Sequence, residues 1–362
     1  MSVEATPVTG DEAKVLAALR AGDESAFVAL TEQYRGRLHL YCYRMLGSLE
    51  EAEDLVQETF LRAWRGRADF EGRSLFRTWL YRIATNACLN MLKRHPRRIL
   101  VADVPPGDPS ARVSPEERAD LGAPPTDLPW LEPYPDSLLE QAAPSESEPD
   151  AIVVSRETIE LAYLAAIQHL PARQRAVLIL RDALGLSAKH AADVLELSIA
   201  SVNSALRRAR STMRTRLPAR RLDWAPVTSP TAEEQAVLQR YMDAHDRADV
   251  AAFTALLRED VRQSMPPYPS WYEGRAAVAA VFARYIDPDS PDYPGHIRLV
   301  PTAANRQLAA AAYLRPPRSA EYRLLGLNVL DIDGGLVREI VSFGVDLLGR
   351  FGLPPILESG PT

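Results

Sequence analysis

The stretch LSAKHAADVLELSIASVNSALRRARSTMRTRL, Leu186–Leu217, has the sharpest local pattern in the chain. Ser187 is placed to cap a short apolar helix, and Ser198 is placed to cap a second helix after a break. From Ile199 to Arg221 there are seven arginines and no acidic residue. A short helix, a tight turn and a basic second helix have the geometry that enters the major groove of DNA.

The polar face of the second helix divides into two parts. Arginines toward its C-terminal end suit phosphates, and small polar residues near its start suit base edges. The plainer alternative is a basic, solvated helix packed in a bundle. The predicted DNA-contacting residues are Ser201, Asn203, Ser204, Arg207, Arg208 and Arg210.

Bulk properties limit the architecture. A chain of 362 residues predicts two or three domains. The net charge of −6 is unevenly spread: residues 101–150 hold twelve acids and two arginines, a local −10, which leaves about +4 elsewhere. Cys42 and Cys88 lie in apolar helical patterns, which fits a reduced, cytoplasmic setting. Since no long apolar run occurs, we expect neither a membrane span nor a secretory signal.

Two helical blocks, residues 11–98 and 153–217, flank a proline-rich segment. Residues 99–150 contain eleven prolines and the acidic excess, so this segment is predicted to be a linker that cannot offset its chain entropy. Its stretch PWLEPYPDSLLE, residues 129–140, carries two aromatic residues and is a candidate for docking.

The pattern changes after residue 231. Helices are expected at Glu233–Asp246, at Val250–Leu257 and after Gly274. Four strand-like runs follow, HIRLVPTAA, QLAAAAYL, EYRLLGLNVLDID and LVREIVSFG, with a hairpin signal at Asp333–Gly335. Helices followed by antiparallel strands predict an α+β domain.

An acidic helix is predicted at Glu51–Arg67, EAEDLVQETFLRAWRGR. One stripe of this helix is apolar, and Asp54, Gln57 and Glu58 lie off that stripe. The plainest interpretation of these three residues is a solvated face. The following stretch, Phe70–Arg98, mixes aromatic residues with cations, a combination that stacks on and holds unpaired bases.

Three motifs in order carry a resemblance to a known family. They are AEDLVQETFLRAW, then FRTWLYRIATNACLNMLKR, then LPARQRAVLILRDALGLSAKHAADVLELSIASVNSALRRAR. The chain resembles the extracytoplasmic-function group of bacterial sigma factors, the specificity subunits of RNA polymerase. The resemblance covers about residues 11–98 and 153–217.

This resemblance implies partners. The acidic helix would dock on the β′ clamp helices of core RNA polymerase through Asp54, Gln57 and Glu58, and the β flap would be a further polymerase contact. The helix-turn-helix would read the promoter −35 element as duplex. The residues implied for the −10 element are Phe76, Trp79, Arg82, Asn86, Asn90, Lys93 and Arg94.

The last block resembles the SnoaL-like, NTF2-like fold, a cone of helices and curved sheet. LLREDVRQSMPPYPSWYEGRAAVAAVF, residues 256–282, is its most similar stretch. Related cones include isomerases, but no acid and base occur at a persuasive spacing, so we favour regulation. The domain would either bind a small apolar ligand or pack against the sigma core and set the spacing of its two DNA-binding modules. No metal or other cofactor is expected. The weak pocket-lining candidates are Tyr241, His245, Tyr268 and Trp271.

The predicted fold class is multidomain, with two all-α sigma domains and a C-terminal α+β NTF2-like cone. The expected boundaries are 11–98, 99–152 (linker), 153–221 and 231–355. The predicted function is an alternative sigma factor without chemistry of its own. Two alternatives stay open: a helix-turn-helix regulator without polymerase contact, and a DNA-binding protein fused to an isomerase-like enzyme.

Overall fold

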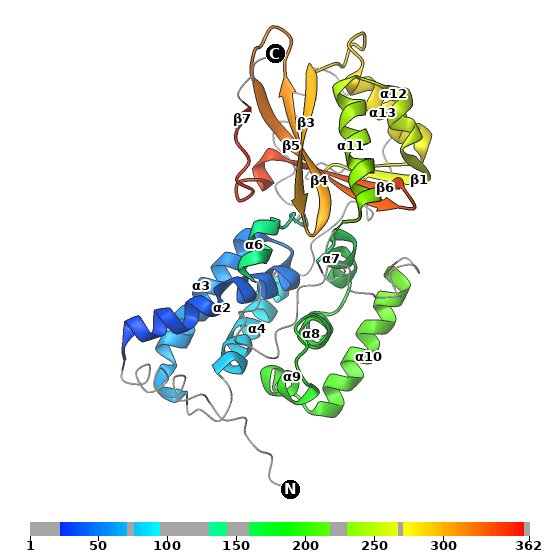
Figure 1. Cartoon of the computed structure of the whole chain (residues 1–362). Helices are drawn as coiled ribbons and strands as arrows, with labels where there is room; N and C mark the ends of the chain where they lie inside the picture. Colours follow the sequence, from blue (N-terminus) through cyan, green and yellow to red (C-terminus); the bar gives the residue numbers. More distant parts are fainter. Residues whose placement is uncertain are drawn as a thin grey trace. The chain divides into compact units, whose positions relative to one another are not determined.

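The computed structural model describes residues 22–70, 76–94, 130–142, 159–217, 230–266 and 271–357. They form two compact units, shown with their elements in Figure 1. The helical unit contains the described residues up to Arg94 together with 138–142 and 166–217. The sheet unit contains 130–137, 159–165 and the described residues from 230 onward.

The first part of the helical unit is a bundle in which α2 and α3 are separated by a short break at Gly47–Ser48. Asp23 caps the first helix by accepting from the amide of Ala26, and Gly47 closes it with φ of 79°. Ser48 then caps the acidic helix. The elements are α2 (Glu24–Leu46), α3 (Leu49–Arg65), the short 3-10 helix η1 (Arg67–Asp69) and α4 (Phe76–Arg94).

The bundle core joins α2 to α4. Tyr41 and Thr85 share a hydrogen bond of 2.7 Å between their hydroxyl oxygens. Cys42 and Cys88 are both buried free thiols, and burial raises the pKa of Cys88 well above its usual value. Burial likewise raises the pKa of Tyr81 to about 12. Cys88 and Tyr81 therefore stay neutral and serve packing.

The second part of the helical unit contains the helix-turn-helix. Ser187 and Ser198 cap its two helices, as predicted, and Glu196 makes the turn between them with φ of 53°. Pro171 suits the first turn of a helix, and the sequence after it predicts one helix to about Leu184. The second half of that helix instead widens into a π-helix. The elements are α7 (Leu161–Gln168), α8 (Ala172–Leu178), the π-helix η4 (Ile179–Ala183), α9 (Ala188–Leu195) and α10 (Ile199–Arg216).

Arg175 of α8 is a buried cation, only 1 % exposed. Its Nη1 donates to the Met45 carbonyl and, at 2.7 Å, to Oε1 of Gln168. Its Nη2 donates to the Gln168 carbonyl at 2.9 Å. Burial lowers the pKa of Arg175 to about 10, which still leaves it charged at neutral pH. The side chain thus joins α8 to the C-terminal end of α2.

The sheet unit is built on a seven-stranded sheet. Its strand order is β2-β1-β6-β5-β4-β3, with β7 paired to β5. β1 and β6 are parallel, and the other pairs are antiparallel. The strands are β1 (Leu257–Ser264), β2 (Trp271–Glu273), β3 (His296–Ala304), β4 (Gln307–Arg315), β5 (Tyr322–Asp333), β6 (Leu336–Gly344) and β7 (Ile356–Leu357).

Three helices cover one face of this sheet (Figure 1). They are α11 (Ala232–Asp246), α12 (Val250–Ala255) and α13 (Arg275–Ile286). Alternate strand residues such as Leu308, Ala310 and Ala312 face these helices, as the strand period of two requires. A 3-10 turn, η6 (Val345–Leu347), follows β6.

The strand predictions for this unit are confirmed for β3 to β6, and so is the hairpin, since Asp333 pairs with Leu336. One helix prediction is wrong at its end. The second predicted helix stops at Ala255, and the chain from Leu257 runs as strand β1. Charged residues at 258–260 hide the strand pattern there.

Part of the predicted linker is folded onto the sheet unit. Trp130 is 5 % exposed and packs against Trp271, while Leu131 and Tyr134 are fully buried. Pro135 forms an isolated bridge with Ala304, and the short helix α6 (Asp136–Gln141) follows. Composition predicted a segment too polar to fold, but three apolar side chains are enough to fix this part of it.

Candidate nucleic-acid interface

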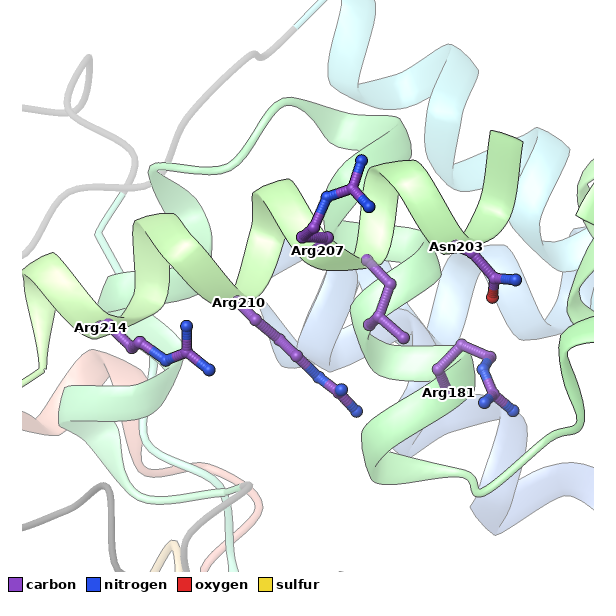
Figure 2. Close-up of a pocket in the computed structure, with 6 residues that line it drawn as sticks. Arg181, Asn203, Arg207, Arg210 and Arg214 are labelled. Atoms are coloured by element: carbon purple, nitrogen blue, oxygen red, sulfur yellow. The ribbon is translucent and has the colours of Figure 1, made fainter. Parts of the chain in front are cut away.

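A cationic groove runs along α10. Its volume is about 360 Å³. Figure 2 shows that α10 supplies most of the lining, with Arg181 coming from the preceding π-helix. The lining residues are Arg181, Asn203, Leu206, Arg207, Arg210 and Arg214.

The amphipathic pattern of α10 positions these cations. Val202, Ala209 and Met213 are buried, so the remaining faces of the helix point to solvent. Arg207, Arg210 and Arg214 are spaced by three and four residues and are exposed. The result is a row of guanidinium groups at the spacing that a phosphate backbone can meet.

An ion pair orients one member of the row. Arg210 donates from Nε to Oδ2 of Asp182 at 2.9 Å and from Nη2 to Oδ1 at 2.6 Å. This bidentate hydrogen bond raises the pKa of Arg210 further. Arg181, the neighbour of Asp182, donates from Nη1 to the Leu186 carbonyl. The π-helix therefore supplies both an acid and a cation to the groove.

The residues predicted for −35 contact lie on the exposed surface of α10, with Ser204 half-buried. Arg208 donates to Oγ of Ser204 at 2.8 Å, and Ser201 shares a 2.8 Å hydrogen bond with Ser198. The groove brings together Asn203, Arg207 and Arg210 from the prediction.

Three lining residues, Arg181, Leu206 and Arg214, were not among the predicted contacts. Arg214 could have been found from its position one helical turn after Arg210. Arg181 lies outside the basic helix, so its place in the groove depends on tertiary packing.

The residues predicted for the −10 element separate into two groups. Asn86, Asn90, Lys93 and Arg94 are exposed along α4, with Lys93 donating to Oδ1 of Asn90 at 3.2 Å, and Arg82 is half-buried. Phe76 and Trp79 instead pack in the core with Phe70, at ring-centroid distances of 5.0–5.7 Å. In this conformation the exposed polar row, rather than the two rings, faces outward.

The acidic helix α3 presents a mixed outer face. Asp54 and Gln57 are exposed, and half-buried Glu58 accepts from Nε of Arg62 at 2.6 Å. Leu61 is 51 % exposed on the same face, one turn further along. An exposed leucine is not expected on a face whose only role is to keep a run of acidic residues in contact with solvent.

The structure does not bring together all the residues predicted to line a pocket in the C-terminal domain. Tyr241 and His245 lie together in the core beneath the helices: Nδ2 of Asn328 donates to the Tyr241 hydroxyl at 3.1 Å, and Nδ1 of His245 donates to the Tyr241 carbonyl at 2.8 Å. Burial lowers the pKa of His245 to about 4, so the ring is neutral at pH 7. Trp271 does not join them, since it packs on Trp130, and Tyr268 lies outside the described residues.

Neither a metal-binding cluster nor a membrane-spanning helix occurs within the described ranges. No group of three or more His, Cys, Asp or Glu side chains in that part of the chain is arranged to hold a metal ion. No helix among the same residues is long and apolar enough to cross a membrane.

Three families of known proteins match consecutive parts of the chain. Sigma-70 region 2 matches residues 30–98, sigma-70 region 4 matches 160–213, and the SnoaL-like domain matches 238–340. The first covers most of α2 and all of α3 and α4, the second contains every groove residue except Arg214, and the third covers most of the sheet unit.

Relatives of this chain are found along most of its length. It is 41 % identical over 343 residues to the ECF RNA polymerase sigma factor SigG of Mycobacterium tuberculosis, covering 93 % of this chain and 86 % of the relative. It is 28 % identical over 200 residues to the ECF RNA polymerase sigma factor SigW of Bacillus subtilis, covering 55 % and 92 %. The crystal structure of M. tuberculosis SigJ, an extracytoplasmic function sigma factor, has a similar fold, with a TM-score of 0.54 at 20 % identity over 89 % of this chain and 98 % of that one.

Proposed function

Because this chain belongs to the extracytoplasmic-function family of RNA polymerase sigma factors, we propose that its helical unit carries three separate contact surfaces, one for polymerase and two for promoter DNA. The chain is an alternative sigma factor, which binds core RNA polymerase, recognises −35 and −10 promoter elements and initiates transcription. The assignment of residues to these steps is the proposal.

The −35 element is read by α10. The observation that supports this most is the groove with four arginines and Asn203 at the recognition helix. Asn203 and Ser201, near the N-terminal end of α10, approach base edges, whereas the arginines further along grip phosphates. Asp182 fixes the direction of Arg210 and so limits which phosphate it meets.

The −10 element is held by α4. Asn86 and Asn90 offer amide groups that can hydrogen-bond to an unpaired base, and Lys93 and Arg94 neutralise the strand. Phe76 and Trp79 support this face from beneath, and they become stacking platforms only if the buried cluster around Phe70 opens.

The outer face of α3 binds core polymerase. Asp54, Gln57 and Glu58 precede the exposed Leu61 by seven, four and three residues on one face of the helix. The face therefore combines an apolar contact with polar residues beside it, as protein interfaces do. We assign the β′ clamp helices to this face. The β flap is assigned to the second half of the helical unit, residues 166–217.

The SnoaL-like unit regulates rather than catalyses. His245 is neutral and packs against Phe253 and Phe282, whose rings stack at 3.7 Å, so the space beside it is filled by aromatic carbon. Asp260, an acidic residue of the same unit, is exposed and held by Arg258 at 2.7 Å, whereas His245 is buried. The two residues therefore do not form an acid–base pair.

Run-off transcription with purified core polymerase tests the polymerase assignment. Asp54→Ala with Leu61→Ala should raise the concentration of chain needed for half-maximal initiation at least about tenfold, since central interface contacts carry most of the affinity. Glu32→Ala, an exposed acid on α2 of the same bundle, is the matched control and should leave initiation unchanged. Equal activity of the two variants would contradict the assignment.

A further inference from the structure

The turn between β3 and β4 is buried, although hairpin turns usually lie at the surface. Asn305 and Arg306 both have φ of 57°, the left-handed conformation that a two-residue hairpin turn requires. Asn305 is nevertheless 0 % exposed, and Gln307 is 3 % exposed. Two separate segments of the connector between α4 and α8, which joins the −10-binding and −35-binding parts of the helical unit, make hydrogen bonds to this turn. They are residues 134–136 and 159–161.

The first segment adds to the turn like a short strand. The Tyr134 amide donates to Oδ1 of Asn305 at 2.8 Å, and the Asn305 amide donates to the Tyr134 carbonyl at 2.9 Å. The Arg306 amide donates to Oδ1 of Asp136 at 2.9 Å. Backbone pairing of this kind is the mode by which sheets capture extended peptides.

The second segment is held by the side-chain amides of the same turn. Nδ2 of Asn305 donates to the Ile159 carbonyl at 2.9 Å. The Leu161 amide donates to Oε1 of Gln307 at 2.8 Å. Asn305 thus uses its amide oxygen for one segment and its amide nitrogen for the other, and no other side chain of its size offers both groups.

Apolar contacts hold the first segment in place. Tyr134 and Leu131 are fully buried, and Trp130 packs against Trp271 of β2. Three residues separate Trp130 from Tyr134, so the segment is fixed at both ends. The buried area, together with the bonds at Asn305, makes this a built site and not a chance contact.

We infer that the turn at residues 305–307 is a clamp on the connector, and that it limits the separation over which the two DNA-binding modules can act on one promoter. This inference rests on the proposed function, because it concerns the distance between the −10 and −35 surfaces. The SnoaL-like unit would thereby restrict the lengths of spacer that the factor accepts.

The lengths involved make such a limit effective. Residues 134 and 159 are 25 apart in sequence, and an extended chain of that length reaches roughly 85 Å. The clamp removes that reach by holding both residues at one turn. The −10 module is tied to the same point through α6, which begins two residues after Tyr134 and places the Gln141 carbonyl against Gly36 of α2. One base pair of spacer changes the required separation of the two modules by only about 3.4 Å. The extra reach that the connector gains when the clamp is released is much longer than this change.

Asn305→Gly is the sharpest variant, because glycine accepts the left-handed turn and removes only the side-chain amide. Arg318→Gly is its control: Arg318 also has positive φ, 70°, but lies exposed in the turn between β4 and β5. In full-length protein, amide exchange at Tyr134 should accelerate at least about tenfold in Asn305→Gly, since one to two hydrogen bonds are lost. The sheet amides of β4 should stay protected in both variants.

A second pair of variants separates the two segments. Asn305→Asp keeps the acceptor for Tyr134 and loses the donor to Ile159, so residues 159–161 should loosen while Tyr134 stays protected. Gln307→Glu keeps the acceptor for Leu161 and should change exchange little. Unchanged exchange at both segments in Asn305→Gly would overturn the clamp.

The functional arm uses holoenzyme made with each full-length variant and a promoter set differing in spacer length. Asn305→Gly should improve initiation at spacers one base pair too long or too short by about fivefold relative to the best spacer, the factor expected for one lost hydrogen bond. Loosened segments with an unchanged spacer profile would overturn the inference while leaving the proposed function intact. If the wild-type holoenzyme fails to initiate at all, the proposed function fails, and the exchange experiment still decides whether the clamp exists.

Discussion

The arginine row on α10 predicts how strongly salt should weaken promoter binding. Of the four groove arginines, Arg210 is paired with Asp182 and Arg181 is bonded to the Leu186 carbonyl, whereas Arg207 and Arg214 are exposed. Each phosphate contact contributes about 0.9 to the slope of log affinity against log salt. Arg207→Gln with Arg214→Gln should therefore lower that slope by roughly 1.8.

This change has a measurable signature. Between about 50 and 200 mM salt, a slope difference of roughly 1.8 corresponds to a twelvefold change in the ratio of wild-type to variant affinity. The deficit of the variant should be largest at low salt and shrink as salt rises. Fluorescence anisotropy of a labelled promoter with holoenzyme, titrated at several salt concentrations, provides the slopes.

Arg240→Gln provides the matched control, because Arg240 is an exposed arginine on α11 of the other unit. It should leave the slope unchanged. If the double variant and the control have the same slope and affinity as wild type, α10 does not contact phosphates and the assignment of the groove is wrong.

Three further changes test the packing that supports these surfaces. Arg175→Met should lower the free energy of unfolding, measured in urea, by about 3 kcal/mol, since the Met45 carbonyl loses a buried charged donor. A change below about 1 kcal/mol would contradict the buried hydrogen-bond network of Arg175. Gly36→Ala places a methyl group 2.6 Å from the Gln141 carbonyl oxygen. The melting temperature should therefore fall, even though alanine improves the helix propensity of α2 by about 1 kcal/mol. A rise in melting temperature would show that α6 moves freely. His245 has a pKa of about 4 in the folded protein, against 6.5 in the unfolded chain. Below pH 6.5 the unfolded chain therefore binds more protons than the folded protein. The contribution of His245 to the free energy of unfolding is complete above pH 6.5 and falls by up to roughly 3 kcal/mol toward pH 4. His245→Phe should flatten that part of a pH series of urea melts, and an unchanged slope would mean that His245 is not the group responsible.

Local patterns in the amino-acid sequence determine much of this protein by themselves. Ser187 and Ser198 cap the helix-turn-helix because their hydroxyls lie three residues before an unsatisfied helix amide, a purely local relation. The strands β3 to β6 follow from strand-like runs bounded by turn residues, among them the glycine turn at residues 334–335. The exposed row on α10 follows from helical spacing alone.

Tertiary structure determines which residues far apart in the sequence come into contact. Arg181 joins the DNA groove and Asp182 pairs with Arg210, across 28 positions, only because the π-helix packs beside α10. Phe76 and Trp79 share the aromatic and basic pattern of a base-binding segment, yet packing with Phe70 buries them. Asn305 has the local pattern of an ordinary turn residue, and its contacts with Tyr134 and Ile159 span 171 and 146 positions. Local rules describe the backbone within a few residues, whereas burial depends on which apolar surfaces meet, and that is settled only when the whole chain folds.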